Sequence, residues 1–179
     1  MLNVSIRYSW QIIKPEGEMT YREHIPNKTR NGFVPVPDRL REFNETQPFG
    51  VLATDDNGKP YTSLISFAIT PDMKRVIFAT PKDTRKYKNI LNTKEVAILI
   101  DNRSNTRKNL MATEAITIIG TARHIRRGKT RDELAALYLR KHPDLEKFIQ
   151  SDTSALIVVE ATRCIHVGKF QTISVWDCS

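Results

Sequence analysis

The stretch FATPKDTRKYKNI, from Phe78 to Ile90, is typical of a β-strand end that turns directly into an α-helix. Asp83 or Thr84 is placed to cap that helix, and Tyr87 and Ile90 are spaced to share one buried face. A helix that starts straight after a strand leaves free backbone N–H groups at the positive end of its dipole. This junction is therefore the first candidate for an anion-binding site.

The side chains at the junction support the same expectation. Thr80 and Thr84 offer hydroxyl groups, Arg85 offers a guanidinium group, and Lys86 offers an ammonium group. Together with the helix start they form the set of donors that a phosphate monoester needs. A solvated basic loop before an ordinary helix fits the spacing equally well, so the residues alone leave both interpretations open.

The segments around this junction predict a sheet with many hairpins. Asn57-Gly58 separates two apolar runs, FGVLAT (49–54) and KPYTSLISFAIT (59–70), which is a strong hairpin signal. The other predicted strands are 75–80, 94–102, 112–125 with a bulge at Gly120, and 155–165; the predicted helices are 38–44, 84–93, one from the capping box of Thr130 and Glu133 to about His142, and 143–150. A mainly β fold follows, with an antiparallel sheet rolled into a barrel and few helices.

One predicted strand, 94–102, is nearly continuous in apolar residues. Such a strand is expected to be covered on both faces. The neighbouring run 59–70 instead carries Thr62, Ser63 and Ser66 among apolar residues, which fits either a strand with one wet face or the lining of a ligand groove.

Length and composition fit one globular domain with a full core. The chain has 179 residues, of which 40% are hydrophobic and 27% charged. We expect residues 1–36 to form an arm and residues 37–179 to form a single domain. The start of the chain lacks the features of a secretory signal, and Cys164 and Cys178 have no zinc-site spacing, so we expect free thiols and a cytoplasmic protein.

The net charge of +8 raises the question of nucleic-acid binding. The excess is divided between two clusters, one in 82–88 and one in 123–131. The second cluster lies around a predicted strand-to-helix turn, where a solvated face is the simpler interpretation. Because no aromatic RNA-binding signature, zinc finger or helix-turn-helix accompanies the charge, specific nucleic-acid binding is the less favoured alternative.

The order of elements around the junction resembles the FMN-binding split-barrel proteins related to pyridoxamine 5′-phosphate oxidase. In that family a strand leads through a short turn to Ser/Thr-Arg-Lys at a helix start, with Asn-Leu/Ile one turn later. The matching positions here are Ala79, Thr80, Thr84, Arg85, Lys86, Asn89 and Ile90, and a later strand matches over 118–122. The resemblance covers roughly residues 38–170.

This resemblance implies an FMN cofactor bound in a groove between two subunits of a homodimer. The phosphate would be held at the strand end and helix start by Thr80, Thr84, Arg85 and Lys86, and Ala79 is a further position expected to bind the cofactor. The isoalloxazine ring would lie along the strand that contains Thr62, Ser63, Leu64 and Ile65. Trp176 is a candidate ring contact, or else an aromatic plug at the dimer interface or under the arm.

Departures from the family pattern argue against pyridoxamine phosphate as the substrate. The chain ends at WDCS without the Arg, His and Trp that grip the pyridoxal substrate, and the family's Gln corresponds to Ala115. His166 is more typical of a structural residue than of a catalytic one, and no residue can be assigned as general acid or base.

We therefore expect a flavoprotein oxidoreductase acting on an unidentified small molecule, or a flavin reductase, with a small-molecule substrate or electron donor as its partner. A non-catalytic barrel that holds a flavin, a deazaflavin or haem is the first alternative, and a nucleic-acid-binding barrel is the second.

Overall fold

The computed structural model describes residues 34–104, 112–168 and 172–178. The predicted arm, 1–36, therefore lies almost wholly outside the described residues. The helices are α1 (Val36–Thr46), α2 (Arg85–Asn92), α3 (Lys129–Lys141), the short 3-10 helix η2 (Pro143–Leu145) and α4 (Glu146–Gln150); the strands are β1 (Phe49–Asp56), β2 (Lys59–Ser66), β3 (Ala68–Ile69), β4 (Arg75–Pro81), β5 (Glu95–Asp101), β6 (Ala115–Ile125), β7 (Ser154–Gly168) and β8 (Thr172–Asp177).

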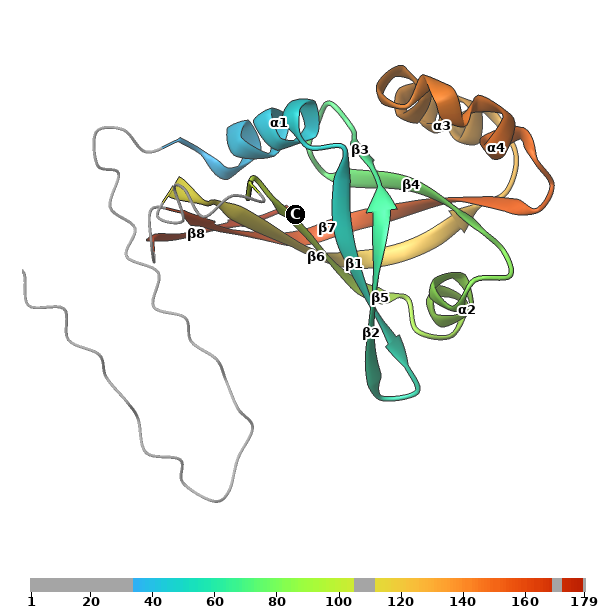
Figure 1. Cartoon of the computed structure of the whole chain (residues 1–179), viewed down its shortest axis with the longest axis horizontal. Helices are drawn as coiled ribbons and strands as arrows, with labels where there is room; N and C mark the ends of the chain where they lie inside the picture. The colour runs from blue at the N-terminus through green and yellow to red at the C-terminus, as the bar shows by residue number, and fades with distance from the viewer. Residues whose placement is uncertain (1–33, 105–111, 169–171, 179) are drawn as a thin grey trace, which may run out of the picture.

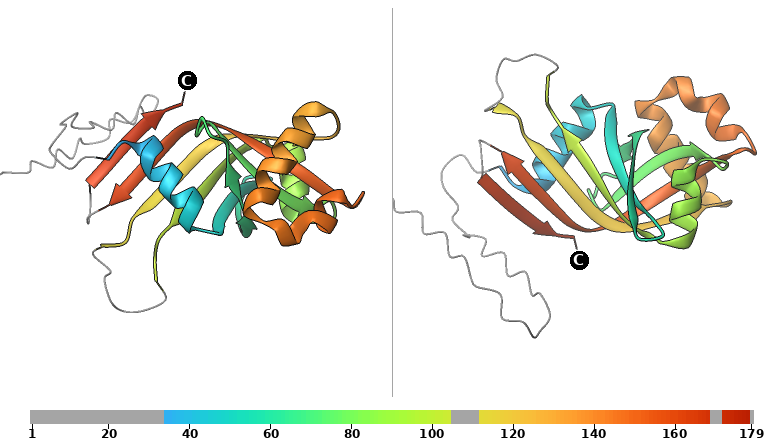
Figure 2. Two further views of the ribbon diagram at one scale, coloured as in Figure 1. Left: turned by 90° about the horizontal axis from the view of Figure 1, so that it is seen from above. Right: turned by 60° about the horizontal axis from the view of Figure 1, so that its bottom comes forward.

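The strands form one antiparallel sheet that curls into a half-barrel. Their order is β2-β1-β5-β6-β7-β4-β3, with β8 paired to the far part of β7. Figures 1 and 2 show β8 at one end of the molecule and α2, α3 and α4 toward the other. The predicted mainly β barrel is confirmed, and its split form is that of the family that the sequence resembles.

The hairpin between β1 and β2 forms as predicted. Asn57 and Gly58 have positive φ angles of 54° and 81°, as a two-residue turn of type I′ requires. The register is regular from Asp56 opposite Lys59 to Phe49 opposite Ser66. The hairpin projects beyond the sheet beside α2 (Figure 1).

Two apolar cores lie on either side of the sheet. The larger one joins the inner faces of the strands to α1 through Leu40 and Phe43, and to α2 through Tyr87 and Ile90. The smaller one packs under α3 and α4 and contains Tyr138. The helices thus cover opposite faces of the sheet, and α2 is fixed on the side of the larger core.

Gly120 lies at a break in the pairing of β6 with β7, as predicted. The register passes from Ile119 opposite Arg163 to Gly120 opposite Ala161, so Thr162 is the extra residue. A Cβ atom at position 120 would lie 2.2 Å from the Glu160 carbonyl oxygen, so only glycine fits. The Thr162 hydroxyl donates to the Ile119 carbonyl at 3.1 Å and satisfies an acceptor at the break.

Three predicted details are wrong. The capping box does not form, because α3 begins at Lys129 with Gly128 as its N-cap residue and no side-chain cap bond. The segment after β7 forms an additional strand, β8, and Cys178 directly after it brings its sulfur within 3.6 Å of the Cys164 sulfur. Strand β5 alternates between buried and half-buried residues, so one of its faces is open within a single chain.

The open face extends across the sheet beyond β5. The register places Leu64, Val51, Leu99, Thr117, Ile165 and Val175 in one row across six strands, on the face opposite the larger core. Leu64 in this row is 62% exposed. No helix in the described ranges is both long and apolar enough to cross a lipid bilayer.

Candidate functional site

At the start of α2, no side chain of the described residues accepts a hydrogen bond from the first-turn N–H groups. Thr84 is the N-cap residue, but its hydroxyl makes no capping bond. That hydroxyl donates instead to the Pro81 carbonyl at 2.8 Å and lies 3.0 Å from the Thr80 hydroxyl, which is buried. The unused donors and the positive end of the helix dipole remain available to an anion.

Arg85 points from α2 toward the β1–β2 hairpin. Its guanidinium lies 3.1 Å from the Asp56 carboxylate and 5.7 Å from the centre of the Tyr61 ring, and its side chain is 63% exposed. The structure therefore brings Arg85 to the predicted site already paired with a carboxylate. An anion that used Arg85 would compete with Asp56.

Lys86 is the cation of this group that has no partner. Its side chain is half-buried, and no hydrogen bond or ion pair involves it within the described ranges. Burial alone lowers the pKa of its ammonium group. A cation that loses water without gaining an acceptor is unfavourable unless an anion binds beside it.

A buried hydrogen bond holds α2 against the hairpin. The Asn89 amide donates to the Thr54 hydroxyl at 3.0 Å, and that hydroxyl donates to the Tyr61 carbonyl at 3.3 Å. Asn89 and Thr54 are both buried. The two bonds give a structural role to Asn89, which the family pattern places one turn after Arg-Lys. Asn89 fixes α2, whose start carries Lys86, against the hairpin.

The predicted ring contacts lie on both faces of β2. Ser63 and Ile65 share the inner face with Tyr61, whereas Thr62 and Leu64 point to the open outer face. The Ser63 hydroxyl is buried and has no hydrogen-bond partner in the part of the chain that the structure describes. Among the described strands β2 pairs only with β1, so its other edge presents unpaired backbone groups, as the expected ring contacts require.

Two predicted residues stand apart from the rest. Ala79 is half-buried, and its side chain faces away from Thr80 by the alternation of β4. Trp176 lies on β8 opposite Cys164 and packs against the larger core. Figures 1 and 2 place β8 and α2 at opposite ends of the molecule, so one chain does not bring Trp176 to Lys86.

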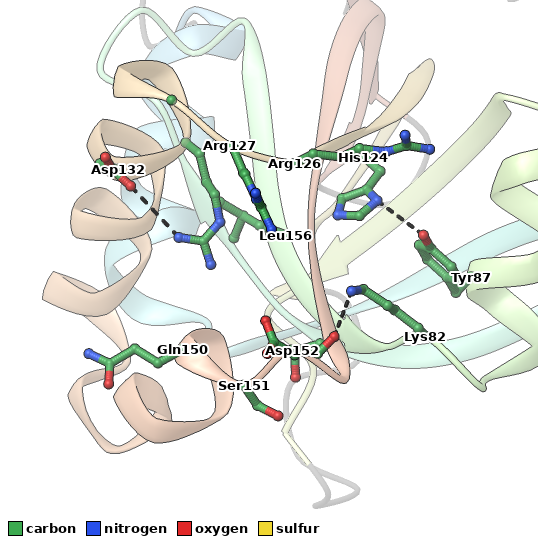
Figure 3. A pocket seen from close by; sticks show the side chains of 13 residues that line it. Lys82, Tyr87, His124, Arg126, Arg127, Asp132, Gln150, Ser151, Asp152 and Leu156 are labelled. Carbon is green, nitrogen blue, oxygen red and sulfur yellow. Dashed lines mark hydrogen bonds and ion pairs between the residues drawn. The ribbon is translucent and has the colours of Figure 1, made fainter.

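Sequence analysis missed a pocket between α2 and the α3–α4 pair, shown in Figure 3. Its volume is about 720 Å³. Its lining includes Arg126, Arg127 and Arg131, from the cluster that we interpreted as a solvated face. None of the residues predicted to bind the cofactor lines it.

Comparisons with known proteins agree with the fold. The family model described as pyridoxamine 5′-phosphate oxidase matches residues 36–168. No curated protein sequence matches the chain.

Three solved structures illustrate the likeness. A haem-binding protein from Mycobacterium smegmatis has a TM-score of 0.72 and 16% identity over 82% of this chain and 59% of its own. HutZ, the haem storage protein of Vibrio cholerae, has a TM-score of 0.62 and 18% identity over 72% and 91%. An FAD-binding protein from Mesorhizobium loti has a TM-score of 0.55 and 14% identity over 72% and 89%.

The chain spans about three-fifths of the Mycobacterium smegmatis protein, and these identities establish a shared fold only. The family match extends from the first residue of α1 to the last residue of β7. The chain therefore belongs to the pyridoxamine 5′-phosphate oxidase family.

Proposed function

We propose that this protein is a homodimeric FMN-binding flavoprotein that acts as an oxidoreductase on a small molecule. The observation that carries the proposal is the unpartnered, half-buried ammonium group of Lys86 beside the start of α2. A phosphate monoester supplies the missing negative charge, and the free first-turn N–H groups supply donors to its oxygens. The residues present fit the phosphate end of FMN.

The remaining residues of the site support binding rather than proton transfer. The Thr80 and Thr84 hydroxyls lie 3.0 Å apart at the phosphate end, and the buried Ser63 hydroxyl lies on the inner face of the edge strand. Ser63 provides an unused donor or acceptor for a polar edge of the ring. When bound, FMN itself supplies the redox chemistry, while the protein orients it and tunes its electrostatics.

A second copy of the chain is the proposed cover of the open sheet face. The large exposed apolar side chains on that face are Phe49, Leu64, Ile119, Val167 and Ile173. They are joined by the half-buried row that begins at Val51 and crosses β5, which makes a continuous apolar surface of the kind found at permanent interfaces. Because Thr62 and Leu64 belong to this face, the interface runs along the strand that would contact the ring.

The proposal is tested by identifying what the protein carries. The full chain is purified and denatured, and the released small molecule is identified by absorbance and mass. FMN, followed by turnover with a nicotinamide electron donor, supports the oxidoreductase; bound FMN without turnover supports a non-catalytic flavin carrier. A colourless protein that does not bind added FMN contradicts the proposal.

Haem is the second candidate, because two of the similar structures are named as haem proteins. Among the described residues each histidine has one ring nitrogen near a neighbour: His124 with Tyr87, His142 with the Phe67 carbonyl, and His166 with Glu114. Haem ligation would use the other nitrogen of one of them. A Soret band in the absorbance spectrum of the purified protein would show that the bound cofactor is haem and not FMN.

A further inference from the structure

The pocket between α2 and the α3–α4 pair is built from segments that are distant in the sequence. Its walls come from Lys82 after β4, Tyr87 of α2, His124 at the end of β6, the start of α3, and the turn from α4 into β7 (Figure 3). At about 720 Å³ it has the size of a site for a small organic ligand.

The pocket has more positive than negative charge. Lys82, Arg126, Arg127 and Arg131 line it, against the two carboxylates of Asp132 and Asp152. Arg131 is held in place, because it donates to the Ile149 carbonyl at 2.9 Å and lies 3.7 Å from Asp132. Arg126 and Arg127 have no ion pair within the described ranges, and both are exposed for a ligand to reach.

Neutral donors complete the lining. Ser154 lines the pocket and is only 9% exposed, and its buried hydroxyl has no hydrogen-bond partner among the described residues. Gly128, the N-cap residue of α3, also lines the pocket and offers no side chain to its first-turn N–H groups. The residue that carries this hydroxyl and the start of an uncapped helix of 13 residues therefore line the same pocket as the two arginines without an ion pair.

An apolar part of the lining distinguishes this pocket from a bare anion site. The Tyr87 and His124 rings meet edge to face with centroids 5.6 Å apart, and the Tyr87 hydroxyl lies 3.0 Å from His124 Nδ1. Burial, reinforced by Lys82, Arg126 and Arg131, lowers the pKa of His124. With Leu156 these rings offer a surface for an organic group.

We propose that this pocket binds a phosphorylated small molecule of nucleotide size. Phosphate fits better than a single carboxylate because it can accept from two guanidinium forks, a hydroxyl and helix N–H groups at once. A pocket of about 720 Å³ fits a small ligand better than a nucleic-acid backbone, which needs an extended groove. The site is separate from that proposed for FMN, since Lys86, Arg85, Thr80 and Thr84 do not line it.

Calorimetric titration of the full chain with ADP, and separately with pyrophosphate, tests the inference. We expect saturable binding with one site per chain, weakened about tenfold by Arg127→Gln and by Arg126→Gln, since each removes a charge-assisted contact. Ser154→Ala should weaken binding severalfold without lowering the melting temperature. Both arginines are exposed, so their variants keep the fold even if Ser154→Ala does not.

Two matched variants keep the result specific. Lys129→Gln removes one charge from the same cluster, but Lys129 does not line the pocket and its side chain is 91% exposed, so binding should change less than twofold. Lys86→Gln should also leave ADP binding unchanged, which separates this pocket from the FMN site. Absence of binding, or equal loss with Lys129→Gln and Arg127→Gln, overturns the inference. Tighter, strongly salt-dependent binding of a random RNA oligonucleotide than of ADP overturns it in favour of a nucleic-acid surface.

Discussion

Two lysines lose water in this fold, and their surroundings differ. Lys141, at the end of α3, donates to the Gln47 carbonyl at 2.8 Å and the Asn44 side-chain oxygen at 3.3 Å, and lies 3.7 Å from the centre of the Phe67 ring. Lys86, at the start of α2, has none of these within the described ranges. Burial lowers the pKa of both ammonium groups.

The difference separates a structural cation from the one that we propose binds a ligand. Fixed carbonyl oxygens and an aromatic ring replace water around Lys141, so this lysine joins α3 to the end of α1 without an anion. Among the described residues, no such groups replace the water that Lys86 loses on burial. A bound anion would take the place of that water. The comparison therefore predicts that FMN binding depends on the ammonium group of Lys86 and does not depend on that of Lys141.

The largest expected effect is on the affinity for FMN. Replacement of Lys86 by Ala should weaken FMN binding by roughly ten- to a hundredfold, because a charge-assisted contact contributes about 1.5–3 kcal/mol. Fluorescence titration of FMN measures the change. Lys88→Ala, an exposed residue of the same helix, is the control and should leave the affinity unchanged; an unchanged affinity in Lys86→Ala removes Lys86 from the site.

A pH effect should follow from Lys141, whose pKa burial lowers to about 8. Between about pH 8 and the usual value of 10.5, the unfolded chain holds a proton on this group that the folded chain has lost. The free energy of unfolding should therefore rise with pH across this window, by about 1 kcal/mol after allowance for solvent screening.

Urea denaturation of the native protein and of Lys141→Met at pH 7.5 and pH 10 isolates this contribution. The native protein should gain stability relative to the variant as the pH rises. A constant difference between the two proteins would show that the Lys141 ammonium keeps its ordinary pKa.

Ser63→Ala should act in opposite directions on stability and on binding. Removal of a buried hydroxyl without a partner should stabilise the ligand-free protein by about 1 kcal/mol. The same change should weaken FMN binding a few-fold if the hydroxyl contacts the ring, since that contact is lost. Thermal unfolding with and without FMN measures both; lower stability without FMN would show that the Ser63 hydroxyl is already satisfied.

Asp56→Asn should have the smallest effect and should strengthen binding. The change removes the carboxylate that holds Arg85 at 3.1 Å and frees the guanidinium for the phosphate. We expect FMN affinity to rise about twofold, because an exposed ion pair contributes only about 0.2–1 kcal/mol. Weaker binding in Asp56→Asn would mean that Asp56 positions Arg85 for the ligand rather than competing for it.

Local patterns predicted most of the fold. The Asn57-Gly58 turn, the strand-to-helix junction and the bulge at Gly120 each depend on a few neighbouring residues, so the sequence contains them directly. The capping box failed because Gly128 adopts a positive φ of 102° and starts the helix before Thr130. Strand β8 was missed although it pairs with the neighbouring end of β7, from Gly168 opposite Thr172 to Arg163 opposite Asp177.

The sequence predicted the candidate site around Lys86 but not the pocket of Arg126 and Arg127, for the same reason. The residues around Lys86 lie within one short segment, so their types and spacing are enough to suggest an anion. The pocket of Arg126 and Arg127 gathers residues from Lys82 to Leu156, and the buried Ser154 hydroxyl gives no signal in the sequence. The pairing of Arg85 with Asp56 likewise depends on how the hairpin bends toward α2.

The extra residue in β7 has a consequence for how this strand can change. On one side of Thr162 the residues that point into the larger core are even-numbered, such as Cys164; on the other side they are odd-numbered, such as Val159 and Ile157. Deletion of Thr162 itself would restore a regular alternation, whereas deletion of a residue nearer Ala155 would exchange the inward and outward side chains between that point and the bulge. Length changes in β7 far from Thr162 should therefore be more harmful than most point substitutions, and homologous chains should vary in sequence there much more than in spacing.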